Sequence, residues 1–329
     1  MEKYTPKLDV LETQKAIRFL RHKFEEKLCD ALNLTRASAP LFVKTGSGLN
    51  DDLNGVERPV RFDILETGEI VEVVHSLAKW KRMALKKYNF PVHSGLYTDM
   101  NAIRRDEKCD QIHSLYVDQW DWEKVITKED RTVDYLKETV KSIYRAVYET
   151  AEEISKLYPQ IDNYLPKEIK FITTTELLDK YPDLTSKQRE DAIAKEMGAV
   201  FLIGIGGKLK NGEKHDSRAP DYDDWTLNGD IIIYNRVIDR SFEISSMGIR
   251  VDKDALLSQL KAEDKEERLN LPFHKALIND ELSLSIGGGI GQSRLCMLIL
   301  QKAHIGEVHS SVWPQSEIDF CKEIGAELL

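Results

Sequence analysis

The residues of this chain best suited to chemistry form a glycine-rich run followed by an arginine. Residues 285–291, SIGGGIG, predict a strand, and Arg294 stands at the start of an apolar helix predicted over residues 292–303. Because glycine has no side chain, the backbone at Gly289 and Gly291 can lie flat beneath a ring such as adenine. The planar guanidinium of Arg294 can pair with the oxygens of a triphosphate. The pattern therefore indicates nucleotide binding.

Two well-known nucleotide-binding loops do not fit these residues. A P-loop needs a glycine, four residues, and then glycine, lysine and a hydroxyl residue. The nearest sequence, GIGGKL at residues 204–209, has neither the hydroxyl residue nor the first glycine. A dinucleotide-binding fingerprint also fails, because Gln292 stands where its third glycine is required. A glycine run alone is more often a bulge or a turn, so its interpretation depends on motifs elsewhere.

Such motifs are present, and they carry a resemblance to a known superfamily. Residues 104–107, RRDE, and residues 113–123, HSLYVDQWDWE, predict an arginine-bearing strand, a loop and an antiparallel return strand. Together with the glycine-rich run, they resemble motifs 2 and 3 of the class II aminoacyl-tRNA synthetase core. Residues 32–42, which include Pro40, resemble its first motif. That motif forms the subunit interface in the superfamily, so the resemblance implies a homodimer.

Longer strings resemble one family built on this core, the ammonia-dependent asparagine synthetases. They are HSLAKWKR (75–82), APDYDDW (219–225), LNGD (227–230) and EISSMGIR (243–250). The resemblance runs from the first helix to the C-terminal helix. It implies a single α+β catalytic domain over residues 1–329, in which an antiparallel sheet is flanked by helices.

The resemblance implies synthesis of L-asparagine from L-aspartate and ammonia. A carboxylate does not react with ammonia at neutral pH, because its carbon is a poor electrophile and its leaving group would be oxide. In the implied reaction, ATP converts the β-carboxylate into β-aspartyl-AMP and pyrophosphate leaves. Ammonia then attacks the activated carbonyl, and AMP departs.

The resemblance also implies a nucleotide site in which Arg104 and Arg294 neutralise phosphate charge. Glu107 would orient the adenine amine or a nearby water, although a surface pairing with Lys108 is an alternative. The carboxylates of Asp230 and Glu243, on neighbouring predicted strands, suit Mg²⁺ shared with the phosphates. The complete predicted nucleotide set is Arg104, Glu107, Ser114, Asp230, Glu243, Ser245, Gly289, Gly291 and Arg294, with Asp230 and Glu243 as metal ligands.

Candidate contacts to aspartate or asparagine come from other parts of the chain. Lys81 and Gln119 can pair with carboxylates, although Lys81 could instead be a solvated helix lysine. The predicted substrate-binding set is Asp51, Ser76, Lys81, Arg104, Gln119, Asp121, Asp223 and Ser246, and its candidate catalytic members are Asp51, Lys81, Arg104, Gln119 and Asp223. Asp221 and Asp223 match acidic family positions near the substrate, in a charged loop over residues 208–225 that is typical of a lid. Which acid deprotonates ammonium stays open.

Hydrophobic periodicity predicts where the main elements lie. Apolar residues at helical spacing predict amphipathic helices over residues 17–32 and 133–154. Thr185 and Gln188 predict a capping box for a helix that Gly198 ends, followed by a strand over residues 199–205. Residues 230–234 and 241–246 predict a hairpin.

Alternation along residues 118–123 predicts which side chains face the site. Side chains of a strand point to opposite faces in turn, so Trp120 and Trp122 should face the core, whereas Gln119, Asp121 and Glu123 should face the site. The same rule requires that one of Arg104 and Arg105 face away; the family motif favours Arg104 as the site residue.

Composition narrows the class of protein. The net charge of -9 and the pI of about 5.5 oppose nonspecific RNA binding, so we expect no nucleic-acid partner. The four cysteines have no CxxC spacing and the eight histidines form no ligand pattern, which argues against zinc. No apolar run approaches the ~20 residues of a membrane span, and the first residues lack a signal peptide, so we expect a cytosolic location.

Two alternatives share the same core. An aspartyl- or asparaginyl-tRNA synthetase core would also form an adenylate, but the acidic charge and the lack of room for an anticodon-binding module before Arg104 argue against it. A noncatalytic amino-acid-binding paralogue would not need Arg104, Asp230, Glu243 and Arg294. Ammonia rather than glutamine is the expected nitrogen donor, because no cysteine has the sequence context of a glutaminase nucleophile.

Overall fold

The computed structural model describes residues 4–51, 53 and 57–329. The helices, in chain order, are α1 (Val10–Leu32), α2 (Ala78–Lys87), α3 (Val133–Leu157), α4 (Thr174–Lys180), α5 (Ser186–Met197), α6 (Lys253–Ala262), the 3₁₀ helix η1 (Glu266–Asn270), α7 (Pro272–Ile278), α8 (Gln292–Ile299), the 3₁₀ helix η2 (Ile305–Glu307) and α9 (Gln315–Ile324). The strands are β1 (Leu34–Arg36), β2 (Phe42–Lys44), β3 (Arg61–Asp63), β4 (Ile70–Val73), β5 (Gly95–Ile103), β6 (Tyr116–Val125), β7 (Lys170–Thr173), β8 (Ala199–Ile203), β9 (Asp223–Asn235), β10 (Arg240–Arg250) and β11 (Ser285–Gly291).

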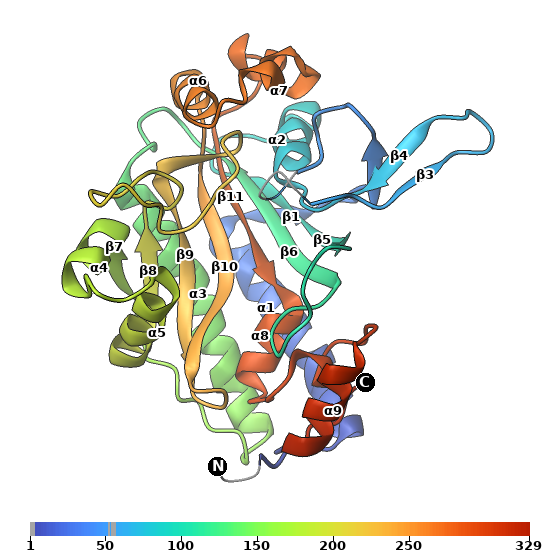
Figure 1. Cartoon of the computed structure of the whole chain (residues 1–329), viewed down its shortest axis with the longest axis vertical. Coiled ribbons are helices and arrows are strands. Elements are labelled where there is room, and N and C mark those ends of the chain that lie inside the picture. The colour runs from blue at the N-terminus through green and yellow to red at the C-terminus, as the bar shows by residue number, and fades with distance from the viewer. Residues whose placement is uncertain (1–3, 52, 54–56) are drawn as a thin grey trace.

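An eight-stranded sheet forms the centre of the molecule, in the order β1-β5-β6-β11-β10-β9-β8-β7. The six inner strands pair antiparallel, as predicted, whereas β1 and β7 pair parallel with their neighbours at the two edges. A smaller sheet, β2-β4-β3, projects from the same side as α2 (Figure 1). The α+β class with an antiparallel sheet flanked by helices is confirmed. The single-domain organisation over residues 1–329 stays a prediction.

Helices α1, α3 and α8 cover one face of the large sheet (Figure 1). The residues that predicted α1 by their spacing, among them Leu20, Phe24 and Leu28, are fully buried. On β6, Trp120 and Trp122 are buried in this core, whereas Gln119 and Asp121 line a cleft on the other face. The predicted alternation of β6 is therefore confirmed, and the face of β6 opposite the core carries polar side chains.

Local signals set several element ends, and the structure corrects others. The capping box of Thr185 and Gln188 is present, and Gly198 ends α5 with a φ of 76°. The predicted strand 199–205 ends at Ile203, because Gly204 turns the chain with a φ of 86°. The predicted helix 292–303 ends at Ile299, shortly before Gln301 adopts a left-handed φ of 54°. The predicted hairpin is confirmed as β9 and β10, which extend well beyond the predicted ranges.

The described residues form no disulfide bond. Cys29 lies in α1 and Cys296 in α8, and all four cysteines are free thiols. Burial is the main reason that the pKa of Cys296 is raised to about 11. Within the described part of the chain, no helix is both long and apolar enough to cross a membrane.

Candidate active site

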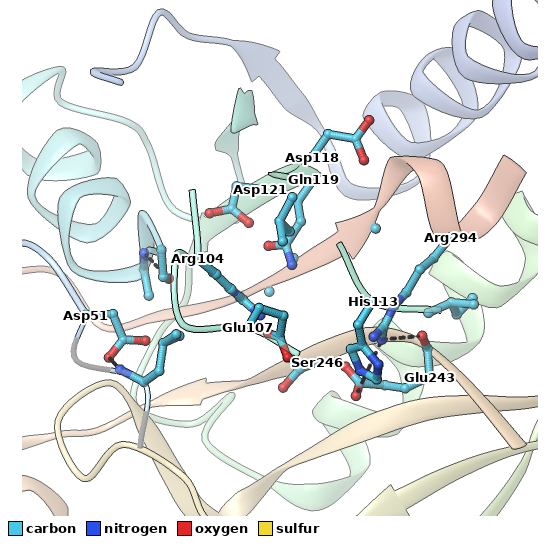
Figure 2. Close-up of a pocket in the computed structure, with 18 of the residues that line it drawn as sticks. Asp51, Arg104, Glu107, His113, Asp118, Gln119, Asp121, Glu243, Ser246 and Arg294 are labelled. Carbon is cyan, nitrogen blue, oxygen red and sulfur yellow. Dashed lines mark hydrogen bonds and ion pairs between the residues drawn. The ribbon is translucent and has the colours of Figure 1, made fainter. Parts of the chain in front are cut away.

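A cleft of about 440 Å³ lies over the polar face of the large sheet. Its walls come from β6, β10 and β11, from α2, from the turn after β5, and from the segment 204–222 between β8 and β9. The predicted site residues that line it are Asp51, Ser76, Lys81, Arg104, Glu107, Ser114, Gln119, Asp121, Asp223, Glu243, Ser246, Gly289, Gly291 and Arg294. Figure 2 shows many of these side chains pointing into one space. The structure thus brings together residues that are far apart in the sequence, while their individual roles stay predictions.

The glycines of β11 make room for side chains from both neighbouring strands. A Cβ atom at Gly287 would overlap the carboxylate of Glu123 from β6 and lie 2.5 Å from Nη2 of Arg250 from β10. At Gly289, a Cβ atom would lie 2.6 Å from Oδ1 of Asp121. Real Cβ atoms do not approach other atoms so closely. The glycine run is therefore required by the charged side chains that cross it, in addition to its predicted place beneath a base.

Arg250 is buried at the centre of this charged floor. Its Nη2 donates to Oε2 of Glu123 at 2.7 Å, and its Nη1 pairs with Asp223. Burial raises the pKa of Asp223, and the attraction of Arg250 only partly offsets this effect. For Glu123, burial also opposes ionisation, but Arg250, together with Lys81 and Ser285, outweighs it and holds the pKa below its usual value. The two acids thus share one arginine but differ in proton affinity.

Lys81 projects from α2 into the same floor and is only 1% exposed. Its Nζ donates to the carbonyl oxygen of Gly288 at 2.9 Å and lies 3.4 Å from Oδ2 of Asp121. Burial lowers the pKa of Lys81, and Asp121 acts in the opposite direction. This burial excludes the alternative in which Lys81 is a solvated helix lysine.

Arg104 follows the last residue of β5, where a turn begins. Its backbone N–H donates to the carbonyl oxygen of Leu115, and its own carbonyl oxygen accepts from the N–H of Glu107. Arg104 and Glu107 both line the cleft, whereas Arg105 is exposed and does not. In the view of Figure 2, Arg104 lies between Asp51 and Arg294 and below Asp121.

Arg294 enters the cleft from the first turn of α8. Its Nη1 donates to the carbonyl oxygen of Glu243 at 3.0 Å and lies 3.8 Å from the Glu243 carboxylate (Figure 2). The guanidinium also lies over the ring of Phe242, 5.9 Å from its centre. These contacts hold the guanidinium beside β10, and 22% of the side chain is exposed.

Asp230, the other predicted metal ligand, is covered by an arginine. It is 4% exposed and forms an ion pair with Arg218 from the segment 204–222, so it does not itself line the cleft. Burial raises the pKa of Asp230 to about 7, although Arg218 favours the charged form. Its Oδ1 atom is buried without a hydrogen bond. No group of three or more candidate metal-ligating side chains occurs among the described residues.

Comparison with known proteins decides the family of this chain. Residues 11–325 match the sequence model of a family described as aspartate-ammonia ligase. The chain belongs to the aspartate-ammonia ligase family. The aspartate-ammonia ligase of Clostridium tetani is 60% identical over 329 residues, which are 100% of this chain and 96% of that protein. That of Levilactobacillus brevis is 55% identical over 100% of this chain and 98% of that protein. The chain is therefore an enzyme of this ligase family.

Solved structures with the same fold are class II aminoacyl-tRNA synthetases. Asparaginyl-tRNA synthetase from Pyrococcus horikoshii, complexed with asparaginyl-adenylate, is 14% identical with a TM-score of 0.67 and is matched over 93% of this chain and 70% of that one. Asparaginyl-tRNA synthetase from Entamoeba histolytica has a TM-score of 0.62 at 15% identity, with 91% of this chain and 66% of that one covered. These similarities establish the ligase's synthetase-like fold.

Besides Asp230, two other residues of the ligase that were predicted to lie near the ligands, Ser245 and Asp221, do not line the cleft. Ser245 is buried opposite Ile231 and Ile290, because a β-bulge between Glu243 and Ser245 turns its side chain away from the cleft. Asp221 is fully buried and bound by Lys79, Arg268 and His274, so it joins neighbouring elements and does not line the cleft.

The cleft of the ligase also contains residues that sequence reasoning missed. Arg250 is the last residue of the motif EISSMGIR (243–250). Because side chains alternate along a strand, Arg250 should face the cleft if Ser246 does. Arg218 lies in the loop that was predicted as a lid. His113 and His309 line the cleft as well, and His309 comes from an irregular segment that carries no sequence signal.

Proposed function

We propose that this ligase makes L-asparagine from L-aspartate and ammonia in an ATP-dependent reaction that passes through β-aspartyl-AMP and releases AMP and pyrophosphate. One observation carries the proposal: a single cleft holds the buried cation Lys81 together with Arg104 and Arg294 over a glycine-rich strand. The curated relatives named aspartate-ammonia ligase support the two substrates. The synthetase-like fold supports an adenylate.

Aspartate binding is assigned to the part of the cleft around Lys81. In a buried site, an ammonium that already touches Asp121 and the Gly288 carbonyl can bind a substrate carboxylate strongly, because water does not compete. Gln119 can donate to the same ligand from the neighbouring position on β6. Asp51 and Asp121 offer acceptors for the α-ammonium, and Ser76 and Ser246 offer hydroxyl contacts.

Adenylate formation is assigned to Arg104. Attack of the β-carboxylate on the α-phosphorus breaks the bond to pyrophosphate, and negative charge builds up between the two reactants. Arg104, between the carboxylate end and the Arg294 region, can contact both reactants during this step. Arg294 can bind the leaving pyrophosphate, and Glu107, Ser114, Gly289 and Gly291 line the space left for the nucleoside.

Asparagine formation follows when ammonia attacks the activated carbonyl. The nitrogen must lose a proton as the C–N bond forms and AMP leaves. Asp223 is the acid best suited to take this proton, because burial raises its pKa and the side chain lines the cleft. Asp51 and Asp121 are other carboxylates of the same cleft that can bind ammonium.

The carboxylates of Asp230 and Glu243 can act as ligands of Mg²⁺. The buried Oδ1 of Asp230 has no hydrogen bond, and hard oxygen donors are the ligands that Mg²⁺ prefers. Two carboxylates are too few for a complete site, so phosphate oxygens would provide other ligands. Bound there, the metal would neutralise phosphate charge.

The decisive test is an incubation of the enzyme with aspartate, ATP, Mg²⁺ and ammonium, in which AMP, pyrophosphate and asparagine are measured together. Equal amounts of the three products are expected. Pyrophosphate without asparagine would instead favour an aminoacyl-tRNA synthetase-like core, and no product from ATP would favour a noncatalytic amino-acid-binding protein.

We also propose a homodimer that forms through the segment around Pro40. This segment follows β1, an edge strand of the large sheet, and the adjacent Leu41 and Phe42 are 51% and 41% exposed. Exposed apolar side chains beside a sheet edge suit a subunit interface. Light scattering on the wild type and on Leu41→Asp tests the proposal: a dimeric wild type and a weakened variant are expected.

A further inference from the structure

Arg218 forms an ion pair with Asp230, one of the two carboxylates that the proposed function assigns to a metal ion. The side chain is 13% exposed, and its Nη2 forms an ion pair with Oδ2 of Asp230. Arg218 comes from the segment 204–222, whereas Asp230 lies on β9 within the sheet. The contact therefore joins a loop above the cleft to the sheet below it.

Each carboxylate of the proposed metal pair has its own arginine. Arg218 pairs with Asp230, and Arg294 lies 3.8 Å from the carboxylate of Glu243. A divalent cation that entered this pair would compete with Arg218 for the same carboxylate. Because Asp230 is buried, the like charges of cation and guanidinium would also repel beside it.

Apart from Asp230, the described contacts of the Arg218 guanidinium lie within its own loop. The other hydrogen bonds of its guanidinium are local, to Oδ2 of Asp216 at 3.0 Å and to the carbonyl oxygen of Ser217 at 2.9 Å, so they can move with it. On one side of Arg218, the ring of His215 is 3.0 Å from Oε1 of Glu190 on α5. On the other side, the Pro220 carbonyl accepts from Gln259 on α6 at 3.0 Å. Only residues 216–219 lie between these two anchors.

We propose that Arg218 holds the place of the divalent cation at Asp230 until a nucleotide arrives, so that the metal binds only together with the triphosphate. Without nucleotide, Arg218 neutralises Asp230 and excludes the metal. When the triphosphate is present, its oxygens give the guanidinium new partners, and Arg218 leaves the carboxylate to the metal. The inference rests on the proposed Mg²⁺-ATP function and adds the residue that makes metal binding conditional on nucleotide.

The test measures metal binding and does not depend on turnover. Free Mn²⁺ is titrated into wild-type enzyme, Arg218→Gln and Arg218→Met, and the unbound ion is followed by electron paramagnetic resonance. Without nucleotide, both variants should bind Mn²⁺ about tenfold or more tightly than the wild type, because no guanidinium competes for Asp230. Adding Asp230→Asn to either variant should remove the gain. The glutamine variant keeps a hydrogen-bond donor toward Asp230, so it serves if the methionine variant is unstable.

A matched control is Arg131→Gln. Arg131 pairs with Asp224 at 2.9 Å and Asp252 at 3.2 Å but does not line the cleft, so its loss should leave Mn²⁺ binding unchanged. The titration is repeated with a nonhydrolysable ATP analogue. If the wild type binds Mn²⁺ with the analogue and the Arg218 variants show no gain without it, the inference is wrong while the proposed function survives. If the wild type fails to bind Mn²⁺ even with the analogue, the metal site itself is wrong and the inference falls with it.

Discussion

Glu123 and Arg250 form a buried ion pair directly over Gly287. The two side chains come from β6 and β10, the strands on either side of β11, and the Oε2 and Nη2 atoms lie 2.7 Å apart. Ser285, on the same glycine-rich strand, donates to Oε1 of Glu123 at 2.7 Å. Gly287 of the middle strand thus leaves the space in which these two charges meet. A side chain at this position would separate them.

Gly287→Ala should therefore destabilise the enzyme by about 3 kcal/mol, because the new methyl group forces apart a buried ion pair. Urea unfolding followed by circular dichroism measures the change. Gly207→Ala is the matched control, since a Cβ atom there meets no atom within 4 Å. Equal stability of the two variants would show that the ion pair can move aside.

Lys81→Met should lower kcat/KM for aspartate by roughly 100-fold, because the substrate carboxylate loses its buried cation. Lys86→Met, on the exposed side of the same helix, should have no such effect. Steady-state kinetics on both variants check the expectation. A folded Lys81→Met enzyme with normal kcat/KM would remove Lys81 from the aspartate site.

The same lysine predicts a pH dependence. Burial lowers the pKa of Lys81 below 10.5, and only the charged form pairs with a carboxylate. Pyrophosphate release from ATP and aspartate should fall as the pH rises through this lowered pKa, and Lys81→Met should lack that fall. The assay omits ammonium so that ammonia does not titrate. The contribution of Lys81 to folding stability has the opposite sign: the unfolded chain binds the proton more tightly, so stability increases with pH between the folded pKa and 10.5.

Arg294→Lys should slow adenylation by roughly 100-fold, because a lysine cannot form two parallel hydrogen bonds to a phosphate. The contacts of Arg294 with Glu243 make loss of stability the competing outcome, so a melting curve accompanies the pyrophosphate assay. Arg105→Lys is the control, since Arg105 is exposed beside the cleft. Near-normal turnover with a lower melting temperature would assign Arg294 a structural role only.

Glutamine should not replace ammonia as the nitrogen donor. All four cysteines lie in the described part of the chain, and none of them lines the cleft, so no thiol there can attack a glutamine amide. Asparagine formation from ammonia-free glutamine should be negligible beside the rate with ammonium. Comparable rates with the two donors would contradict this prediction.

Local sequence rules predicted much of the fold because the interactions behind them are short-range. The spacing of Leu20, Phe24 and Leu28 predicted α1, and Thr185 with Gln188 predicted the start of α5. Alternation along β6 separated the core face from the cleft face. Element ends were less accurate, because residues such as Gly204 and Gln301 end an element through backbone conformations that periodicity does not describe.

Within the cleft, sequence motifs identified residues but not the partners of their charges. Lys81, Arg104, Gln119 and Arg294 were found from motifs, and all line the cleft. Ser245 was misplaced, because a bulge in β10 changes which residues face outward. The sequence motifs therefore predicted which segments line the cleft better than they predicted the direction of each side chain.

By itself, the sequence determined the family, the polar face of β6 and the glycine-rich strand β11, because each is written in neighbouring residues. Only the tertiary structure decided that Arg250 pairs with Glu123, 127 positions away, and that Arg218 pairs with Asp230. Charge pairs act through space over a few ångströms, and the chain path that brings the partners together is a property of the whole sheet and its loops.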